Sequence, residues 1–360
     1  MGVSEKNTVC RATLIIGTYT ESAQQGICGA SFDLESGELG PVRTLAATSN
    51  PSFLVASGGC LYAVNEWGRV AGEDVGGLST FRIDKTSGEL SPLSAIAQGG
   101  VLCHLMVDAT GRWLFVCAYG AGTVSTWQIL PDGSIGERVA VVQHHGRGAN
   151  EARQSGPHAH HVVLSPDNRR AFVADLGLDK VMVYEFDVTT GALTPGFEEA
   201  PFATLPGGAG PRHVAFTPSG AFLYAVSELS NTVTAFRVGP RGLQPLQTIG
   251  ALPTGFAGQS FTAEIAVHPS GRFLYVSNRG HDSLAHYGIE ADGQLKLMGF
   301  APTGRAPRHF TFDERGRWLL VANQLDRSIF VFAVEPASGI LTWRHQLEDV
   351  PGQPTCLLLV

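Results

Sequence analysis

The sequence lacks the features that mark membrane proteins and nucleic-acid-binding proteins. None of the apolar runs in its 360 residues approaches the roughly 18 that a transmembrane helix needs. Its 25 basic residues are outnumbered by 32 acidic ones, and the resulting net charge of −7 argues against a nucleic-acid partner. The short apolar run 12–16 has no basic flank and does not resemble a secretory signal.

Cysteine is scarce as well, with six scattered residues and no C-x-x-C pair. In a chain of this size, that pattern favours free buried thiols over a disulfide framework. We therefore expect a soluble cytoplasmic protein that has no membrane partner and is a monomer or a weak homo-oligomer.

Glycine is abundant, with 44 residues, and one pattern of about fifty residues returns seven times. The pattern is clearest at a Gly turn that precedes an apolar residue. These glycines are Gly37, Gly88, Gly133, Gly191, Gly242, Gly293 and Gly339. Their spacings of 51, 45, 58, 51, 51 and 46 residues indicate stacked or radial copies of one supersecondary unit.

Each copy contains four short β-type runs. In one copy, residues 212–217 and 222–226 flank a Pro/Gly turn and predict a hairpin. The run 232–238 alternates like a half-buried strand, and a weak edge strand begins at Leu243. Four antiparallel strands per unit, seven units and no helical periodicity predict an all-β, seven-bladed β-propeller that forms a single domain over residues 1–360.

The two ends of the chain predict how the ring closes. The first copy begins at its second strand, residues 14–16, with no first strand before it. The chain ends on residues 354–360, which resemble the first strand at 51–55. We expect the C-terminal strand to pair into the N-terminal blade and so remove two unpaired edges.

Alignment of the seven copies shows where unusual polar residues gather. The start of the first strand reads Ser52, Cys103, His160, Arg212, Ala263, Arg308 and Thr355. The neighbouring position reads Phe53, His104, His161, His213, Glu264, His309 and Cys356. The end of the second strand reads Tyr19, Glu66, Tyr119, Leu176, Glu228, Arg279 and Gln324. These positions share one mouth of the central channel, where a ligand site is expected.

Residues that recur in several blades are interpreted differently from those that do not. A recurrent histidine is more often architectural than catalytic, hydrogen-bonding the backbone of a neighbouring blade. This interpretation covers His104, His213 and His309. The better functional candidates differ from the residues found at the same aligned position in the other copies. They are Arg212, Glu228, Arg279 and Arg308.

The longest insertion, residues 143–160, lies at the same mouth. It is polar and Gly-rich, and a loop of this length is usually functional or disordered. It carries Arg153, His158 and His160. Its histidines have no acidic or thiol ligand run nearby, so we predict neither a metal nor a cofactor, with a metal site as the weaker alternative.

Several motifs at these positions carry a resemblance that extends over essentially the whole chain. They are residues 16–20, 153–160, 210–213, 227–229, 263–265, 277–281 and 322–324. With these motifs the chain resembles the lactonase-type seven-bladed propellers. That family includes propeller-type 6-phosphogluconolactonases and fungal 3-carboxy-cis,cis-muconate lactonizing enzymes.

The resemblance implies a site formed by His158 or His160, Arg212 and Glu228. The histidine would activate water, and the arginine would face the developing oxyanion. Glu228 would orient the histidine or act as the base itself. Substrate-binding roles are expected for Tyr19, Glu66, Arg153, Glu264, Arg279, Arg308 and Gln324. Among them, Arg279 and Arg308 offer planar forks for a phosphate or a carboxylate.

A mouth rich in Arg and His on an acidic protein indicates a small anionic lactone as substrate. The leading hypothesis is hydrolysis of a sugar-acid lactone, with 6-phosphogluconolactone of the oxidative pentose phosphate pathway as the first candidate. Other sugar lactones remain open. Two alternatives are a muconate-type lactonizing enzyme and a non-enzymatic propeller that serves as a binding platform.

Overall fold

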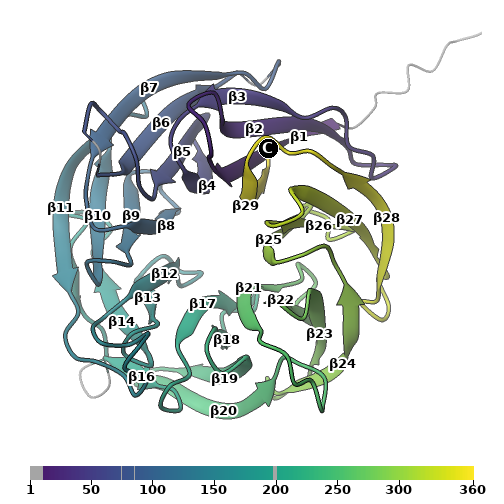
Figure 1. The fold of residues 1–360 in the computed structure, drawn as a ribbon. Helices are drawn as coiled ribbons and strands as arrows, with labels where there is room; N and C mark the ends of the chain where they lie inside the picture. Colours follow the sequence, from purple (N-terminus) through teal and green to yellow (C-terminus); the bar gives the residue numbers. More distant parts are fainter. Residues whose placement is uncertain (1–10, 74, 85, 198–200) are drawn as a thin grey trace, which may run out of the picture.

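Seven β-sheets surround a central axis in the computed structural model, which describes residues 11–73, 75–84, 86–197 and 201–360 (Figure 1). The innermost strands face the axis and the later strands of each sheet lie outside them. Over those ranges no residue is helical, and accordingly no helix is long and apolar enough to span a bilayer. The prediction of an all-β, seven-bladed propeller is confirmed.

The strands of each blade follow one another from the axis outward. Blade 1 contains β29 (Gln353–Leu359), β1 (Arg11–Tyr19), β2 (Gly26–Asp33) and β3 (Arg43–Ala47). Blade 2 contains β4 (Pro51–Ser57), β5 (Cys60–Asn65), β6 (Gly77–Ile83) and β7 (Leu90–Ala97). Blade 3 contains β8 (Leu102–Val107), β9 (Trp113–Ala118), β10 (Thr123–Ile129) and β11 (Ile135–Gln143). Blade 4 contains β12 (Ala159–Leu164), β13 (Arg170–Asp175), β14 (Lys180–Phe186), β15 (Leu193–Pro195) and β16 (Phe202–Thr204).

The last three blades have the same order. Blade 5 contains β17 (Pro211–Phe216), β18 (Phe222–Ser227), β19 (Thr232–Gly239) and β20 (Gly242–Gly250). Blade 6 contains β21 (Phe261–Val267), β22 (Phe273–Arg279), β23 (Ser283–Ile289) and β24 (Leu295–Pro302). Blade 7 contains β25 (Pro307–Phe312), β26 (Trp318–Asn323), β27 (Ser328–Val334) and β28 (Leu341–Leu347).

Blade 4 differs from the prediction of four strands per blade. Both β15 and β16 pair with β14, so its outer position is filled by two short pieces instead of one strand. An edge strand contributes little burial, which makes such a division tolerable at the rim.

The two ends of the chain meet in blade 1, as predicted. Strand β29 pairs antiparallel with β1, from Leu14 opposite Leu359 to Tyr19 opposite Gln353. Figure 1 shows the C-terminal strand beside β1, on the axis side of it. Leu357 packs into a cluster shared with Trp318 and Leu320 of blade 7, so the same strand also seals the contact between the last blade and the first.

The hydrophobic core lies between neighbouring blades. Seven buried clusters fill the spaces between the seven sheets, and each draws side chains from two adjacent blades. The second strands are buried on both faces, as β5 and β9 show along their whole length. Each blade is therefore stabilised by its neighbours, which leaves the polar residues at the strand ends free to form a site.

The repeated glycines have a physical reason to be glycine. Gly293 has φ +89°, and a Cβ there would lie 2.2 Å from the Phe222 ring of the preceding blade. Gly37 has φ +78° and would place a Cβ 2.6 Å from Trp318. These turns press against the neighbouring blade in the left-handed region, a conformation that residues with a side chain rarely adopt. The repeat that identifies the fold in the sequence is thus a blade-to-blade contact.

The cysteines are free thiols over the described ranges, as expected, and Cys10 lies outside them. The five are Cys28, Cys60, Cys103, Cys117 and Cys356.

Candidate active site

A bulge at the start of the inner strands turns two consecutive side chains toward the axis. In β4, β8, β12, β17 and β25 the register shifts at a single residue next to the second strand. The bulged residues are Ser52, Cys103, His160, Arg212 and Arg308. Because a bulge interrupts the alternation of a strand, neighbours such as Arg212 and His213 can both line one cavity.

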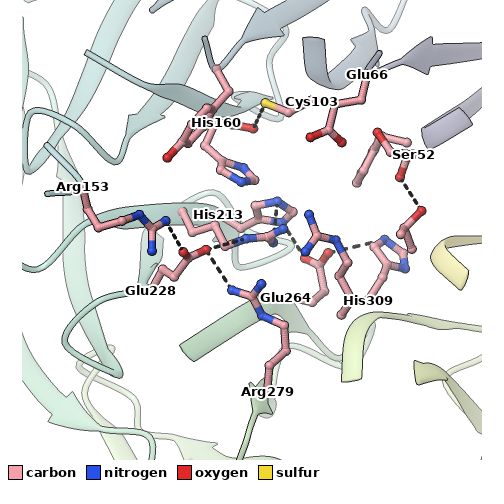
Figure 2. A pocket seen from close by; sticks show the side chains of 15 residues that line it. Ser52, Glu66, Cys103, Arg153, His160, His213, Glu228, Glu264, Arg279 and His309 are labelled. Carbon is pink, nitrogen blue, oxygen red and sulfur yellow. Dashed lines mark hydrogen bonds and ion pairs between the residues drawn. The ribbon is translucent and has the colours of Figure 1, made fainter. Parts of the chain in front are cut away.

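These side chains enclose a cavity of about 190 Å³ at one mouth of the channel. That volume is smaller than the roughly 300–1,000 Å³ of drug-sized sites and suits a small ligand. Four arginines and three glutamates line it, which leaves a surplus of one positive charge when the histidines are neutral. Figure 2 shows Arg153, Arg279 and His213 pointing into this space from different blades. The lining residues are Ser52, Phe53, Glu66, Cys103, Tyr119, Arg153, His160, Arg212, His213, Glu228, Glu264, Arg279, Arg308, His309 and Thr355.

Glu228, which follows β18, holds three of the four arginines. Its Oε1 accepts a hydrogen bond from Arg153 Nη2 at 2.7 Å, and its Oε2 accepts one from Arg279 Nη2 at 2.8 Å. Arg212 Nε lies 3.2 Å from the same Oε2 (Figure 2). Burial alone would raise the pKa of Glu228, but the charges of Arg279 and Arg212 and the hydrogen bond from Arg153 outweigh it and lower the pKa to about 2.

This arrangement argues against both roles expected for Glu228. Its carboxylate oxygens contact arginines and not a histidine, so it does not orient one. With a pKa of about 2 it is also a poor proton acceptor near neutrality. Glu228 instead fixes the guanidinium groups around the cavity.

Arg212 is held on several sides. Its Nη1 donates to Ala263 O at 2.9 Å and lies 3.0 Å from His213 Nε2. His213 Nδ1 in turn lies 3.0 Å from Glu264 Oε1. The interpretation of His213 as a residue that bonds to a neighbouring backbone is therefore wrong, because Glu264 presents a carboxylate where other blades present a backbone N–H.

The predicted hydrogen bond to the backbone of a neighbouring blade is confirmed for His104 and His309. His104 Nδ1 accepts the Val162 N–H of the next blade at 3.3 Å, and His309 Nδ1 accepts the Leu357 N–H of blade 1 at 3.2 Å. His309 also lines the cavity, with its Nε2 3.4 Å from Glu264 Oε2.

The two histidines left open by the sequence are placed differently. His160, from β12, lines the cavity and is buried, and its Nδ1 has no hydrogen-bond partner. Burial, with the charge of Arg212 next, lowers its pKa well below the ordinary value, so it is neutral near pH 7. His158 is not brought to the cavity; its Nδ1 lies 2.9 Å from Tyr119 O and its ring stacks on Tyr119 at 4.3 Å.

Tyr19, Glu66 and Arg308 form a second group of hydrogen-bonded side chains, separate from the group around Glu228. Tyr19 donates to Glu66 Oε2 at 2.8 Å and accepts from Arg308 Nη2 at 2.7 Å. Tyr19 thus stands behind Glu66 and Arg308 and does not itself line the cavity. Gln324 lies away from it and donates to Gln353 Oε1 at 2.8 Å, so the structure does not bring Gln324 to the site.

The loop 143–160 is anchored to blade 4. His144 bonds to Asp175 at 2.6 Å and to the Tyr184 hydroxyl at 2.9 Å, and all three are buried. The loop contributes Arg153 and leads into His160. Over the described residues, no group of three or more His, Cys, Asp or Glu side chains is arranged to hold a metal ion.

Sequence reasoning missed some lining residues although it had aligned them. Ser52, Phe53, Cys103, Tyr119 and Thr355 stand in the same columns as the chosen candidates. The available signal was membership of the aligned positions alone, and it does not suffice, because Gln324 belongs to the same set and does not line the cavity.

The buried histidines predict acid lability. Burial is the largest of the causes that lower the pKa of five histidines: His104, His160, His161, His213 and His309. The pKa of His161 falls from 6.5 to about 4. Above pH 6.5 these groups are neutral in both states; below it the unfolded chain binds protons that the folded chain does not. Stability should therefore fall as the pH drops from about 6.5 towards 4, by about 3 kcal/mol for His161 alone.

Calorimetric melts between pH 8 and pH 4 check this expectation. His161→Asn should make the decline shallower, because one of the titrating groups is gone. A melting temperature that stays constant between pH 7 and pH 4.5 would contradict it.

Comparison with known proteins agrees with this fold. Residues 13–359 match the family described as Lactonase, 7-bladed beta-propeller. The chain is 32% identical to a 6-phosphogluconolactonase of Bacillus subtilis, over 95% of this chain and 96% of that protein. The periplasmic gluconolactonase of Pseudomonas aeruginosa superposes with a TM-score of 0.89 and 36% identity, covering 97% of this chain and 99% of that one. A protein from Lactobacillus plantarum does so with a TM-score of 0.88 and 30% identity, with the same coverage. The chain therefore belongs to the lactonase family of seven-bladed β-propellers.

Proposed function

We propose that the protein hydrolyses a sugar-acid lactone, and that its substrate is 6-phosphogluconolactone. The observation that carries the proposal is a neutral, buried His160 and a firmly held Arg212 lining one small cavity with a positive surplus. The 6-phosphogluconolactonase of Bacillus subtilis and the gluconolactonase of Pseudomonas aeruginosa support the reaction class. On this proposal the enzyme acts in the cytoplasm, in the oxidative pentose phosphate pathway.

In the proposed reaction His160 is the base and Arg212 stabilises the oxyanion. Neutral His160 accepts a proton from water while that water attacks the lactone carbonyl, so no free hydroxide has to form first. The oxygen that gains negative charge faces the Arg212 guanidinium, where a positioned donor is worth roughly 3–4 kcal/mol. When the tetrahedral intermediate collapses, the C–O bond to the ring oxygen breaks and that oxygen receives the proton back from His160. The product is the open hydroxy acid.

Arg308 is the arginine best suited to hold the anionic end of the substrate. The other three surround Glu228, whereas Arg308 forms no ion pair with any residue that the structure describes. Its Nη2 donates to the neutral Tyr19 hydroxyl, and its remaining donors are available at the cavity. A guanidinium fork of this kind matches a phosphate or a carboxylate.

A direct assay tests the proposal. The purified protein is offered 6-phosphogluconolactone, gluconolactone and a carboxymuconate, with spontaneous lactone opening subtracted. Fastest turnover of the phosphorylated lactone is the expected result, unchanged by a chelator. Lactone formation from the carboxymuconate alone would favour the lactonizing alternative, and no turnover of any compound would contradict an enzymatic role.

Arg308→Ala is expected to raise the KM for 6-phosphogluconolactone by roughly 10- to 100-fold, because a charge-assisted hydrogen bond contributes about 1.5–3 kcal/mol. The KM for gluconolactone, which lacks the phosphate, should change much less. Steady-state kinetics with both substrates measure this difference. Arg305→Ala removes an exposed arginine from the same segment and serves as the matched control. An equal effect of Arg308→Ala on both substrates would show that Arg308 does not bind the phosphate.

A further inference from the structure

His104, His213 and His309 occupy equivalent positions on the innermost strands, and Glu264 gives one of them, His213, a different hydrogen bond. At His104 and His309, Nδ1 accepts a backbone N–H from the next blade. A ring nitrogen that accepts a hydrogen bond carries no proton, so both neutral rings carry theirs on Nε2. His213 occupies the equivalent position in blade 5, and its neighbour in blade 6 is Glu264.

At this position the backbone N–H is already taken. Glu264 Oε1 accepts the Ile265 N–H at 3.0 Å and lies 3.0 Å from His213 Nδ1. Because a carboxylate only accepts, His213 must carry its proton on Nδ1. Its Nε2 therefore keeps a lone pair, the reverse of the arrangement in His104 and His309.

That lone pair faces Arg212. Arg212 Nη1 has two hydrogens, and its two partners are His213 Nε2 at 3.0 Å and Ala263 O at 2.9 Å. The Nε lies 3.2 Å from Glu228 Oε2. Nη1 is thus fully hydrogen-bonded, whereas Nε faces Glu228 as an ion pair without a hydrogen bond. Nη2 is the terminal nitrogen left to serve a ligand in the cavity that Arg212 lines.

We propose that Glu264 and His213 are positioning residues that fix Arg212 for the reaction. Glu264 sets the proton of His213 on Nδ1, and the Nε2 lone pair then anchors Nη1 so that Nη2 is presented to the substrate oxygen. This inference rests on the proposed lactone hydrolysis. A donor that is already oriented needs no rearrangement when charge develops, so losing its support lowers the rate more than the binding.

A double-mutant cycle tests the link to Arg212. His213→Ala is expected to lower kcat by roughly 10- to 100-fold with KM changed by less than about two-fold. A loss of this size is typical when a residue that orients a functional side chain is removed. His213→Gln, whose amide oxygen can accept from Nη1, should recover part of the rate. In an Arg212→Ala background, His213→Ala should have almost no further effect on kcat. The same loss in both backgrounds would overturn the proposal.

His104→Ala is the matched control. It removes a buried histidine from the equivalent position of blade 3, where the ring serves a backbone N–H. Its kcat per folded molecule should stay near that of the wild type. A loss equal to that of His213→Ala would show that removal of any buried histidine from the innermost strands lowers the rate, and that release of Arg212 is not the cause.

A second measurement does not depend on turnover. Long-range ¹H–¹⁵N spectra of histidine-labelled protein report which ring nitrogen is protonated. His213 is expected in the Nδ1–H form, with His104 and His309 in the Nε2–H form. The same form at all three would overturn the inference. If the wild-type protein opens no lactone, the proposed function fails, and this spectrum separately decides whether Glu264 sets the proton of His213.

Discussion

Arg212→Ala is expected to lower kcat for lactone hydrolysis by roughly 10²- to 10³-fold, the loss typical of removing one oxyanion donor. The fold should survive, because Glu228 keeps its hydrogen bonds with Arg153 and Arg279 and is not left as an unpaired buried charge. Initial rates, corrected for spontaneous opening, and a thermal melt of the same preparation measure both effects.

A surface arginine provides the comparison for this variant. Arg43 pairs with Glu89 at an exposed position, where an ion pair contributes about 0–1 kcal/mol. Arg43→Ala should leave both rate and melting temperature close to the wild type. If Arg212→Ala retained the full rate, Arg212 would have no part in the chemistry.

Removal of residues 353–360 is expected to abolish the cooperative melt or lower the melting temperature by tens of degrees. The deletion takes away the inner strand of blade 1 and leaves β1 with an unpaired edge. It also exposes the cluster between blades 1 and 7, where Leu357 alone contributes about 1.5–3 kcal/mol. Losses of this kind approach the whole stability of a domain, about 5–15 kcal/mol.

A synthetic peptide of residues 353–360 provides the control for the deletion. Added to the shortened protein, it should restore part of the melting transition by occupying the vacant place beside β1. Unchanged melting of the shortened protein without the peptide would disprove closure by the C-terminal strand.

The fold was predictable from the sequence because its signals are local and repeated. Copies of the Gly turn such as Gly37 and Gly293 mark a close contact between a blade and its neighbour. The missing first strand before Leu14 and the surplus strand after Gly352 pointed to the same closure. Seven copies also allow comparison of equivalent positions, and this comparison singles out Arg212 and Glu228 from the sequence alone.

The contacts within the site were not predictable in this way. The choice between His158 and His160 depends on a ring stacked on Tyr119, a contact between blades that no spacing reveals. The pairing of Glu228 with three arginines and not with a histidine depends on side-chain reach across blades 4, 5 and 6. His213 was misinterpreted because its difference from other histidines lies in its neighbour Glu264, 51 residues later in the chain.

The closure of blade 1 has a consequence for biosynthesis. Its inner strand, β29, follows all the other strands in the sequence, whereas β1 precedes them. A growing chain can pair the strands of blades 2 to 7 in order, since each blade is continuous in sequence. The ring itself can close only after β29 has been synthesised, so the nascent protein must carry an open edge on β1 until then.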